Sequence, residues 1–311
     1  MDIFDQKGLH PMLISEMREP FDDPDYLFEL KLDGERCVAY LDGSGTVLQN
    51  KRALNLNARY PELTEIHKTA RKKCILDGEL AILVDGKPDF SQVQRRSLLS
   101  NCFKIQMAMQ DYPACFTAFD ILYYQDHPVM DYPLEERKVL LEKSISENGT
   151  LAISRTIDES GIALYELAAG QDLEGVVAKR KGSLYYPGKR TKDWIKIKNL
   201  QDDDFVVCGY DDKGNGIVSV VLGQYEGDQL TYKGHVTLGI SRDDFRIIAQ
   251  VPCTEPIFED RDDDTIWIRP ELVCTVKYMG KTASGMLRQP VFKGLRNDKD
   301  PRDCQAGPVN K

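Results

Sequence analysis

Residues 28–36 read FELKLDGER and place a lysine, Lys31, among alternating apolar and charged residues. This alternation predicts a strand, because successive side chains of a strand point to opposite faces. Asp33 and Gly34 follow at once, and Asp-Gly is typical of a tight turn. Taken alone, the stretch predicts an exposed lysine on a hairpin, and only the rest of the chain can assign it chemistry.

The composition is that of a globular protein with about two domains. The chain has 311 residues, of which 41% are hydrophobic and 29% charged. No apolar stretch approaches the ~18 residues needed to cross a membrane, and the N-terminus lacks the basic start and apolar core of a signal peptide. None of the eight cysteines forms a C-x-x-C pair, so we expect reduced thiols, a cytoplasmic protein and no structural zinc site.

Charge is unevenly distributed. The net charge of −9 argues against a surface coated by nucleic acid. However, residues 179–198 contain eight basic side chains and one acidic one, Asp193. Such a run is often only a solvated face, but it could also bind phosphates.

The chain changes character near residue 200. Residues 1–200 mix strands with helical patterns at 61–72, 90–110, 134–146 and 159–170, which predicts an α+β domain. Residues 201–204 form a polar break. Short strands with glycine-rich turns and one helix then fill 201–311, which is typical of a small β-barrel such as an OB-fold.

Several predicted strands carry a charge among apolar residues. Glu79 lies in the strand ILDGEL, Glu174 begins EGVVAK, and Lys196 and Lys198 share one face of WIKIK. A buried strand does not tolerate an unpaired charge, so we expect these side chains to meet in one polar cleft. Carboxylates for Mg²⁺ together with cations for phosphate oxygens are what a metal–nucleotide site needs.

The ordered set of motifs resembles the ATP-dependent DNA ligases of the covalent nucleotidyltransferase superfamily. The resemblance is closest to the compact ligases of bacteria and phages and to the ligase module of bacterial end-joining proteins. It covers nearly the whole chain, in the order HPML (10–13), ELKLDGER (29–36), ILDGEL (75–80), FTAFDILYY (116–124), LEGVVAKR (173–180), SLYYPGKRTKDWIKIK (183–198) and MLRQPVFKGLRNDK (286–299).

This resemblance implies an ATP-grasp-like nucleotidyltransferase domain of antiparallel sheets and helices at 1–200, followed by an OB-fold domain at 201–311. It also implies that Lys31 attacks the α-phosphorus of ATP and carries AMP. A nucleophilic lysine must lose its proton, which a desolvated, cation-rich cleft favours. Asp33 would hold the lysine or a metal-bound water, and Gly34 would let the backbone approach the nucleotide.

The resemblance also assigns the other site residues. Glu29 would accept a hydrogen bond from the adenine amino group, Phe119 would stack on adenine, and Glu79 and Glu174 would hold Mg²⁺ or Mn²⁺. The remaining nucleotide contacts would come from Leu30, Arg36, Glu79, Arg190, Lys196 and Lys198. The segment that closes over ATP and orients pyrophosphate would be Arg288, Arg296, Asp298 and Lys299.

One motif departs from the family pattern. The family has an arginine in an S/T-R-N-G stretch, whereas this chain reads QNKRALNLN at 49–57. An ungapped alignment puts Lys51 in that place, and a shift of one residue puts Arg52 there. We prefer Arg52, because a guanidinium fork suits phosphate better than an ammonium.

The implied activity is sealing of 5′-phosphate/3′-hydroxyl nicks in duplex DNA by a monomer, through lysyl-AMP and a DNA-adenylate. A hinge at 199–204 would let the second domain change its face between steps. A DNA-end-binding or clamp protein could assist, and no membrane partner is expected. Three alternatives remain: an RNA ligase, a capping guanylyltransferase, and a non-catalytic nucleic-acid clamp that keeps the fold.

Overall fold

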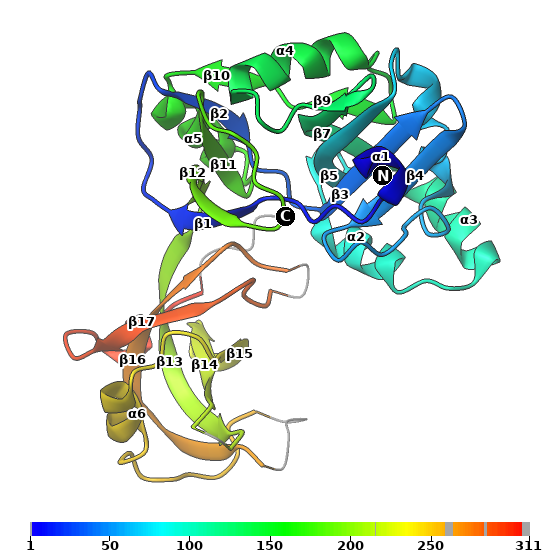
Figure 1. The fold of residues 1–311 in the computed structure, drawn as a ribbon. Coiled ribbons are helices and arrows are strands. Elements are labelled where there is room, and N and C mark those ends of the chain that lie inside the picture. The colour runs from blue at the N-terminus through cyan, green and yellow to red at the C-terminus, as the bar shows by residue number, and fades with distance from the viewer. Residues whose placement is uncertain (1, 215, 259–263, 283–284, 307–311) are drawn as a thin grey trace. The chain divides into compact units, whose positions relative to one another are not determined.

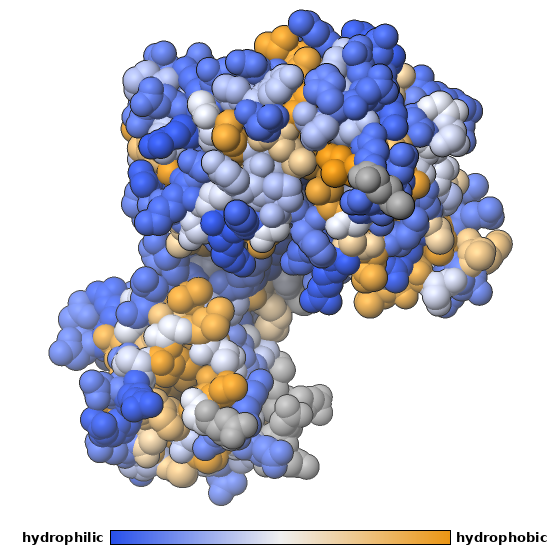
Figure 2. All heavy atoms as spheres, viewed as in Figure 1, coloured by the Kyte–Doolittle hydropathy of each residue, from blue (hydrophilic) through white to orange (hydrophobic). Residues whose placement is uncertain are grey.

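A computed structural model describes residues 2–214, 216–258, 264–282 and 285–306. The chain divides into two compact units, Met1–Asn199 and Leu200–Lys311 (Figure 1). In the described residues no helix is both long and apolar enough to span a membrane. Hydrophilic side chains make up most of the visible face of the first unit (Figure 2).

The first unit contains two sheets. The first sheet has the order β1-β12-β11-β2-β10. Its strands are β1 (Leu13–Met17), β2 (Tyr26–Leu30), β10 (Thr156–Asp158), β11 (Gly175–Arg180) and β12 (Arg190–Lys198). Helix α5 (Gly161–Gly170) packs on one face through an apolar cluster that includes Phe28, Leu164 and Ile195.

The second sheet is mainly antiparallel, in the order β4-β3-β5-β7-β8, with β6 on β5 and β9 on β7. Its strands are β3 (Glu35–Asp42), β4 (Gly45–Asn50), β5 (Cys74–Val84), β6 (Lys87–Pro88), β7 (Ala114–Tyr124), β8 (His127–Pro128) and β9 (Leu151–Ile153). The helices are the short α1 (Ile3–Gln6), then α2 (Phe90–Ser97), α3 (Cys102–Asp111) and α4 (Leu134–Ser144).

An apolar cluster joins the two sheets of the first unit. Val38 and Ile75 reach it from β3 and β5, and Trp194 reaches it from β12. A separate core cluster, which includes Leu76, Val93 and Leu141, joins the second sheet to α2 and α4. The sheets thus form inner layers with helices outside them, and polar side chains on the facing sheet surfaces must meet between the layers.

The helix predicted at 61–72 is wrong. The structure has two 3₁₀ turns there, Pro61–Leu63 and Ile66–Thr69. The hydroxyls of Thr64 and Thr69 donate to carbonyls three residues back, at 2.7 and 2.8 Å. Such side-chain bonds offer the backbone an alternative to a continuous helix. The segment 90–110 is helical as predicted, but it forms two helices separated at residues 98–101.

The Asp33-Gly34 pair is not a hairpin turn. It carries the chain from β2 in the first sheet to β3 in the second. A Cβ on Gly34 would lie 2.2 Å from the carbonyl oxygen of Leu80 in β5. Glycine is therefore required by the close approach of this connection to β5. Gly34 also lines the larger cavity described below, so its expected approach to a nucleotide stays a prediction.

The second unit is a five-stranded antiparallel sheet of OB-fold type, in the order β15-β14-β13-β16-β17. The strands are β13 (Gln201–Asp212), β14 (Val218–Glu226), β15 (Gln229–Val236), β16 (Ile266–Tyr278) and β17 (Val291–Arg296), with helix α6 (Arg242–Ile248) and a 3₁₀ turn at Pro301–Asp303. Phe205, Leu222 and Val276 belong to its core.

The polar run 201–204 is not a break. It begins β13 and pairs with β16, from Gln201 opposite Tyr278 to Asp204 opposite Thr275. The Thr275 hydroxyl donates to Asp204 at 2.6 Å, which gives the acidic strand a polar partner. Only Asn199 and Leu200 of the expected 199–204 hinge lie outside strands, between β12 and β13, and the hinge itself stays a prediction.

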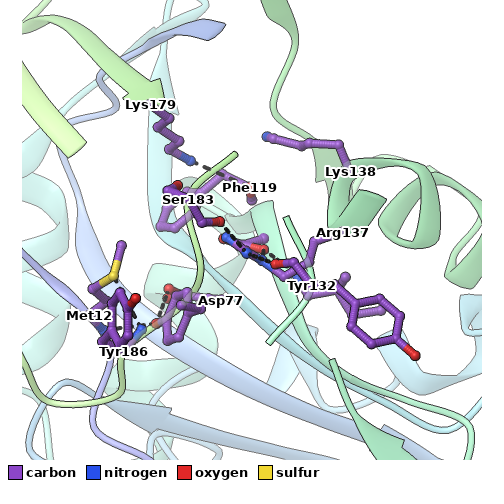
Figure 3. A network of polar contacts seen from close by, with 12 residues as sticks. Met12, Asp77, Phe119, Tyr132, Arg137, Lys138, Lys179, Ser183 and Tyr186 are labelled. Carbon is purple, nitrogen blue, oxygen red and sulfur yellow. Dashed lines mark hydrogen bonds and ion pairs between the residues drawn. The ribbon is translucent and has the colours of Figure 1, made fainter. Parts of the chain in front are cut away.

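A buried ion pair ties α4 to β7. Arg137 donates to both oxygens of Asp120, at 2.8 and 2.9 Å, and neither side chain is exposed. Its remaining nitrogen donates to the carbonyls of Tyr132 and Ser183, at 2.6 and 2.9 Å (Figure 3). Breaking a buried pair leaves an uncompensated charge, so we expect the first unit to depend on this contact.

The variant Arg137→Leu should lower the free energy of unfolding of the first unit by roughly 3–5 kcal/mol. The chain has two tryptophans, so in a Trp267→Phe background chemical denaturation can be followed through Trp194 in the first unit. Arg155→Leu is the control, because the Arg155–Glu147 pair is largely exposed and such pairs contribute less than ~1 kcal/mol. Equal losses from the two variants would refute the role given to Arg137.

Candidate active site

Strand register gathers the charged side chains on one face of the first sheet. Glu29 in β2 pairs with Val177 in β11, which pairs with Lys196 in β12. One step along, Lys179 lies opposite Trp194. Paired residues share a face, and every second residue of a strand returns to it. The residues on this face are Glu29, Val177, Lys179, Trp194, Lys196 and Lys198, whereas the opposite face is apolar and packs against α5.

Lys31 lies just beyond the end of β2, beside the start of β11. Its backbone N–H donates to the carbonyl of Gly175 at 2.8 Å. Its ammonium is 2.6 Å from Glu174 Oε2, and Lys198 Nζ is 3.9 Å from the other oxygen of that carboxylate. Burial, partly offset by Lys31, raises the pKa of Glu174, and the charge of Asp33 raises it further. The structure thus brings together Lys31, Asp33, Glu174 and Lys198.

Glu29 is a buried carboxylate between two lysines. It is 2% exposed, and its Oε1 is 2.5 Å from Lys138 Nζ of α4 and 3.0 Å from Lys179 Nζ of β11. Figure 3 shows the two lysines extending into the same space. Burial alone would raise the pKa of Glu29, but the two lysines hold it below its usual value. Glu29 is therefore an anion that can accept a hydrogen bond.

Lys179 also contacts Phe119. Its Nζ lies 4.2 Å from the centre of the Phe119 ring and 4.3 Å from that of Trp194. It also donates to the Phe119 carbonyl at 3.4 Å. Burial, opposed by Glu29 and reinforced by Lys138, lowers the pKa of Lys179 to about 8. This lysine is a buried cation against aromatic rings, an arrangement that stabilises its charge.

Arg36 is held by a buried carboxylate. It donates to both oxygens of Asp77 at 2.6 Å, and the Tyr185 hydroxyl donates to the same carboxylate at 2.6 Å. Although burial disfavours the guanidinium charge, Asp77 raises the pKa of Arg36. Its Cζ lies 4.5 Å from the centre of the Phe119 ring. Arg36 is thus fixed between Asp77 and Phe119.

Glu79 lies on the same face of β5 as Asp77, two residues earlier. Burial raises the pKa of Glu79 to about 8, while Arg36 and Lys31 oppose the shift and Glu174 and Asp77 add to it. A carboxylate that cannot ionise easily at neutral pH gains most from a cation. Glu79 therefore fits the role of a metal ligand.

Two cavities adjoin at Arg36 and Glu79. The smaller, of about 70 Å³, is lined by Ile14, Glu29, Leu30, Lys31, Leu32, Arg36, Glu79, Phe119, Ser154, Val177, Lys179 and Trp194. The larger, of about 440 Å³, is lined by Gly34, Glu35, Arg36, Asn50, Lys51, Arg52, Leu54, Glu79, Phe90, Val93, Gln94 and Ser97. Both Lys51 and Arg52 line the larger cavity, so the structure leaves the choice between them open.

Two expected nucleotide contacts differ from the others in position. Leu30 lines the smaller cavity, but its side chain packs against the apolar cluster on the other face, so it can offer only its backbone. Arg190 begins β12, where it pairs with Leu13 of β1, and so lies at the opposite end of this strand from Lys196 and Lys198. Arg190 is exposed and donates to the carbonyl of Ile14 at 2.9 Å.

Four predicted catalytic residues lie in the second unit. Arg296, at the end of β17, donates to both oxygens of Asp298 at 3.0 and 2.6 Å. Arg296 and Lys299 also donate to one oxygen of Asp204, at 2.9 and 2.8 Å. The backbone of Arg288 exchanges hydrogen bonds with Met279 and Gly280. Arg296, Asp298 and Lys299 thus form one cluster around Asp204.

Sequence reasoning gave no role to Lys138, Lys179 or Asp77. Lys179 could have been found from the sequence, because it is a charged residue in the otherwise apolar strand EGVVAK, as Glu79 is in ILDGEL. Asp77 carried the same signal. Lys138 carried none, because a lysine in the helix LEERKVLLEKS is ordinary and only the packing of α4 buries it.

Metal ligands are sparse in the described part of the chain, where no three His, Cys, Asp or Glu side chains are grouped to hold an ion. Glu79 and Glu174 both border the Lys31 site. Mg²⁺ is usually held by one or two carboxylates plus substrate phosphates and waters. The two glutamates therefore fit an ion that arrives with a phosphate ligand.

Two protein-family models match most of the chain. Residues 11–198 match the ATP dependent DNA ligase domain family, and residues 213–299 match the ATP dependent DNA ligase C terminal region. The chain is 29% identical to DNA ligase C1 of Mycolicibacterium smegmatis, covering 98% of this chain and 94% of that protein.

Longer relatives contain the same region. The chain is 30% identical to the multifunctional non-homologous end joining protein LigD of Pseudomonas aeruginosa over 96% of its length, but it spans only 37% of that protein. Among solved structures, mycobacterial DNA ligase D complexed with ATP and MES matches with a TM-score of 0.57 and 27% identity, covering 97% of this chain and 99% of that one.

The carboxyl of Glu79 should titrate near pH 8, and changing a charged neighbour should move this midpoint in a direction set by the sign of the neighbour's charge. Removing the Lys31 charge with Lys31→Met should raise the midpoint, because that charge favours the ionised form. Removing the Glu174 charge with Glu174→Gln should lower it. Carbon-13 NMR of glutamate labelled at the carboxyl, assigned with Glu79→Gln, measures the three midpoints. An ordinary midpoint near 4.5 in all of them would contradict the burial of Glu79.

Proposed function

The chain belongs to the family of ATP-dependent DNA ligases, and we propose that Lys31 is the residue through which it transfers AMP from ATP to a nick in duplex DNA. The observation that carries this proposal is the arrangement around Lys31. The lysine borders a cleft that is also lined by the buried anion Glu29, the rings of Phe119 and Trp194, and Glu79. Glu174 contacts Lys31, and Lys196 and Lys198 lie on the same face of the sheet as Glu29. Each group matches one part of a metal-bound nucleotide.

The adenine end would be recognised by Glu29 and Lys179. Adenine presents an amino donor next to a ring nitrogen acceptor. A carboxylate beside an ammonium matches that pair. Guanine instead carries a carbonyl acceptor where adenine carries its amino group, and this acceptor cannot donate a hydrogen bond to Glu29. The cavity of about 70 Å³ is smaller than a nucleoside. The purine therefore stacks on Phe119 only after side chains that line the cavity shift.

The phosphate end would be held at the opposite end of the cleft. Lys196 and Lys198 share the face that bears Lys31, and the Glu79 and Glu174 carboxylates would hold a divalent cation there. A bound Mg²⁺ or Mn²⁺ would offset phosphate charge and compete with Lys31 for Glu174. The Lys31–Glu174 pair must open before the lysine amine can lose its proton and attack.

The reaction has three phosphoryl-type steps. Lys31 Nζ attacks the α-phosphorus, an N–P bond forms, and pyrophosphate leaves with the electrons of the broken P–O bond. The 5′-phosphate oxygen at the nick then displaces Lys31 and takes the AMP. Finally the 3′-hydroxyl, losing its proton, attacks that 5′-phosphorus and releases AMP. Arg288, Arg296, Asp298 and Lys299 of the second unit would orient the leaving pyrophosphate.

Nicked duplex DNA is the proposed substrate, bound by a monomer. Lys51 or Arg52 in the larger cavity would contact a phosphate, and the exposed basic residues of the 179–198 stretch, Arg180, Lys189, Arg190 and Lys192, would add electrostatic attraction. The relative from Pseudomonas aeruginosa is named for non-homologous end joining, which supports a role in DNA repair. A DNA-end-binding or clamp protein would then be the additional partner, and the cytoplasm the compartment.

Labelling with α-³²P-ATP and Mg²⁺ on a denaturing gel tests the proposal. Wild-type protein should become labelled and transfer the label to nicked DNA, while Lys31→Ala should show neither. Lys192→Ala is the matched control, because this exposed lysine lies in the same basic stretch, and it should label normally.

Labelling from α-³²P-GTP instead of ATP would turn the assignment to a capping guanylyltransferase. Transfer to nicked RNA but not to nicked DNA would identify an RNA ligase. No label from either nucleotide, in protein first stripped of AMP with pyrophosphate, would leave the non-catalytic clamp.

Lys138→Met should weaken recognition of adenine. It removes one of the two cations that keep Glu29 ionised, so the KM for ATP should rise roughly tenfold, as for loss of a charged contact. The ratio of kcat/KM for ATP to that for GTP should fall with it. Lys143→Met, an exposed lysine on the same helix, serves as the control. An unchanged nucleotide preference would separate Lys138 from base recognition.

A further inference from the structure

Two cations of the second unit share one buried carboxylate. Arg296 Nη1 and Lys299 Nζ donate to the same oxygen of Asp204, at 2.9 and 2.8 Å. The other oxygen accepts the Thr275 hydroxyl at 2.6 Å. Asp204 lies in β13, so the contact joins the first strand of the barrel to the last residue of β17, Arg296, and to Lys299 just beyond it.

The three charged groups differ in their access to water. The side chain of Asp204 is 11% exposed, whereas those of Arg296 and Lys299 are 38% and 27% exposed. Although burial opposes its ionisation, Lys299, Thr275 and Arg296 together lower the pKa of Asp204. The carboxylate therefore faces the interior, and the cations cover it and reach solvent.

An arriving anion could meet this cluster in two ways. It could pull Arg296 and Lys299 away from Asp204, in which case Asp204 is a competitor. That route leaves a buried carboxylate without a counter-ion, which is strongly unfavourable. Alternatively the anion could bind from the solvent side while the contacts to Asp204 persist, in which case Asp204 is an anchor.

The donor count favours an anchor. A guanidinium has five N–H donors, and the described contacts of Arg296 use three of them, two to Asp298 and one to Asp204. An ammonium has three donors, and Lys299 uses one on Asp204. Both heads thus keep further protons for a phosphate oxygen. The side chain of Asp298 is 62% exposed, so Arg296 can exchange this carboxylate for an arriving anion at little cost.

We propose that Asp204 is a positioning residue that holds the Arg296 and Lys299 heads together as a preformed binding site for the pyrophosphate end of ATP. This inference rests on the proposed function and assigns Asp204 to one chemical step only. Pyrophosphate is present when Lys31 takes AMP and when that step reverses. It is absent when the 3′-hydroxyl closes a DNA-adenylate. Asp204 should therefore act on the first step and not on the last.

Asp204→Asn tests this assignment in the full-length chain. Asparagine keeps the size of the side chain and an acceptor for Thr275 but removes the charge that anchors both cations. The ATP concentration for half-maximal adenylation of Lys31 should rise roughly tenfold or more, since hydrogen bonds to charged groups are strong. The pyrophosphate concentration for half-maximal reversal should rise equally. Closure of a nick that already carries AMP should stay within about twofold of wild type on this account, because no pyrophosphate takes part in it.

Asp203→Asn is the matched control. Asp203 precedes Asp204 in β13, and its carboxylate accepts from Gln224 Nε2 at 2.9 Å. The substitution makes the same change in charge, and both half-saturating concentrations should stay near wild type. Thr275→Val is a second test that keeps the Asp204 charge but removes the bond that orients it. It should shift both concentrations in the same direction as Asp204→Asn, by a smaller factor.

Four outcomes would overturn the inference. A lower ATP requirement in Asp204→Asn would make Asp204 a competitor. Shifts equal to those of Asp203→Asn would reduce the effect to general electrostatics. An equal loss of nick closure would show a structural role. A wild-type protein that cannot be labelled by ATP would remove the proposed function as well, and this result distinguishes that failure from a failure of the Asp204 assignment alone.

Discussion

The antiparallel register of β2, β11 and β12 is the constraint on which the rest of the site depends. It places Glu29, Lys179, Lys196 and Lys198 on one face and leaves the other face apolar against α5. A slip of one residue in any of these strands would turn its charges into the apolar layer, where an unpaired charge is very costly. Packing of the apolar face thus fixes the position of the polar one.

Buried charges in the first unit occur as pairs that join different elements. Arg36 with Asp77 joins β3 to β5, and Arg137 with Asp120 joins α4 to β7. Glu29 joins β2 to α4 and β11 through its two lysines. Such pairs hold the walls of the cleft at fixed positions. Glu79 differs, because its pKa of about 8 shows that the surrounding cations do not fully offset its burial.

Each unit also neutralises the cations that we propose bind phosphate. In the first, Lys31 and Lys198 face Glu174, and in the second, Arg296 and Lys299 face Asp204. A cation held by a carboxylate of its own unit keeps a defined orientation without a ligand. Asp204 is more buried than Arg296 and Lys299, so the two cations, and not the carboxylate, face the solvent from which an anion would arrive.

The sequence by itself determined the order of the motifs, the family, the two folds and most of the charged residues around Lys31. These follow from local patterns, because a charge in an apolar strand is visible without knowing its partner. The tertiary structure alone decided that Pro61–Thr69 forms 3₁₀ turns, that Arg190 lies at the opposite end of β12 from Lys198, that Lys138 pairs with Glu29, and that Arg296 and Lys299 pair with Asp204. The physical reason is that burial and ion pairing are set by elements distant in the chain. An ordinary helical lysine or an acidic strand residue shows its role only when α4 packs on β7 and β13 pairs with β16.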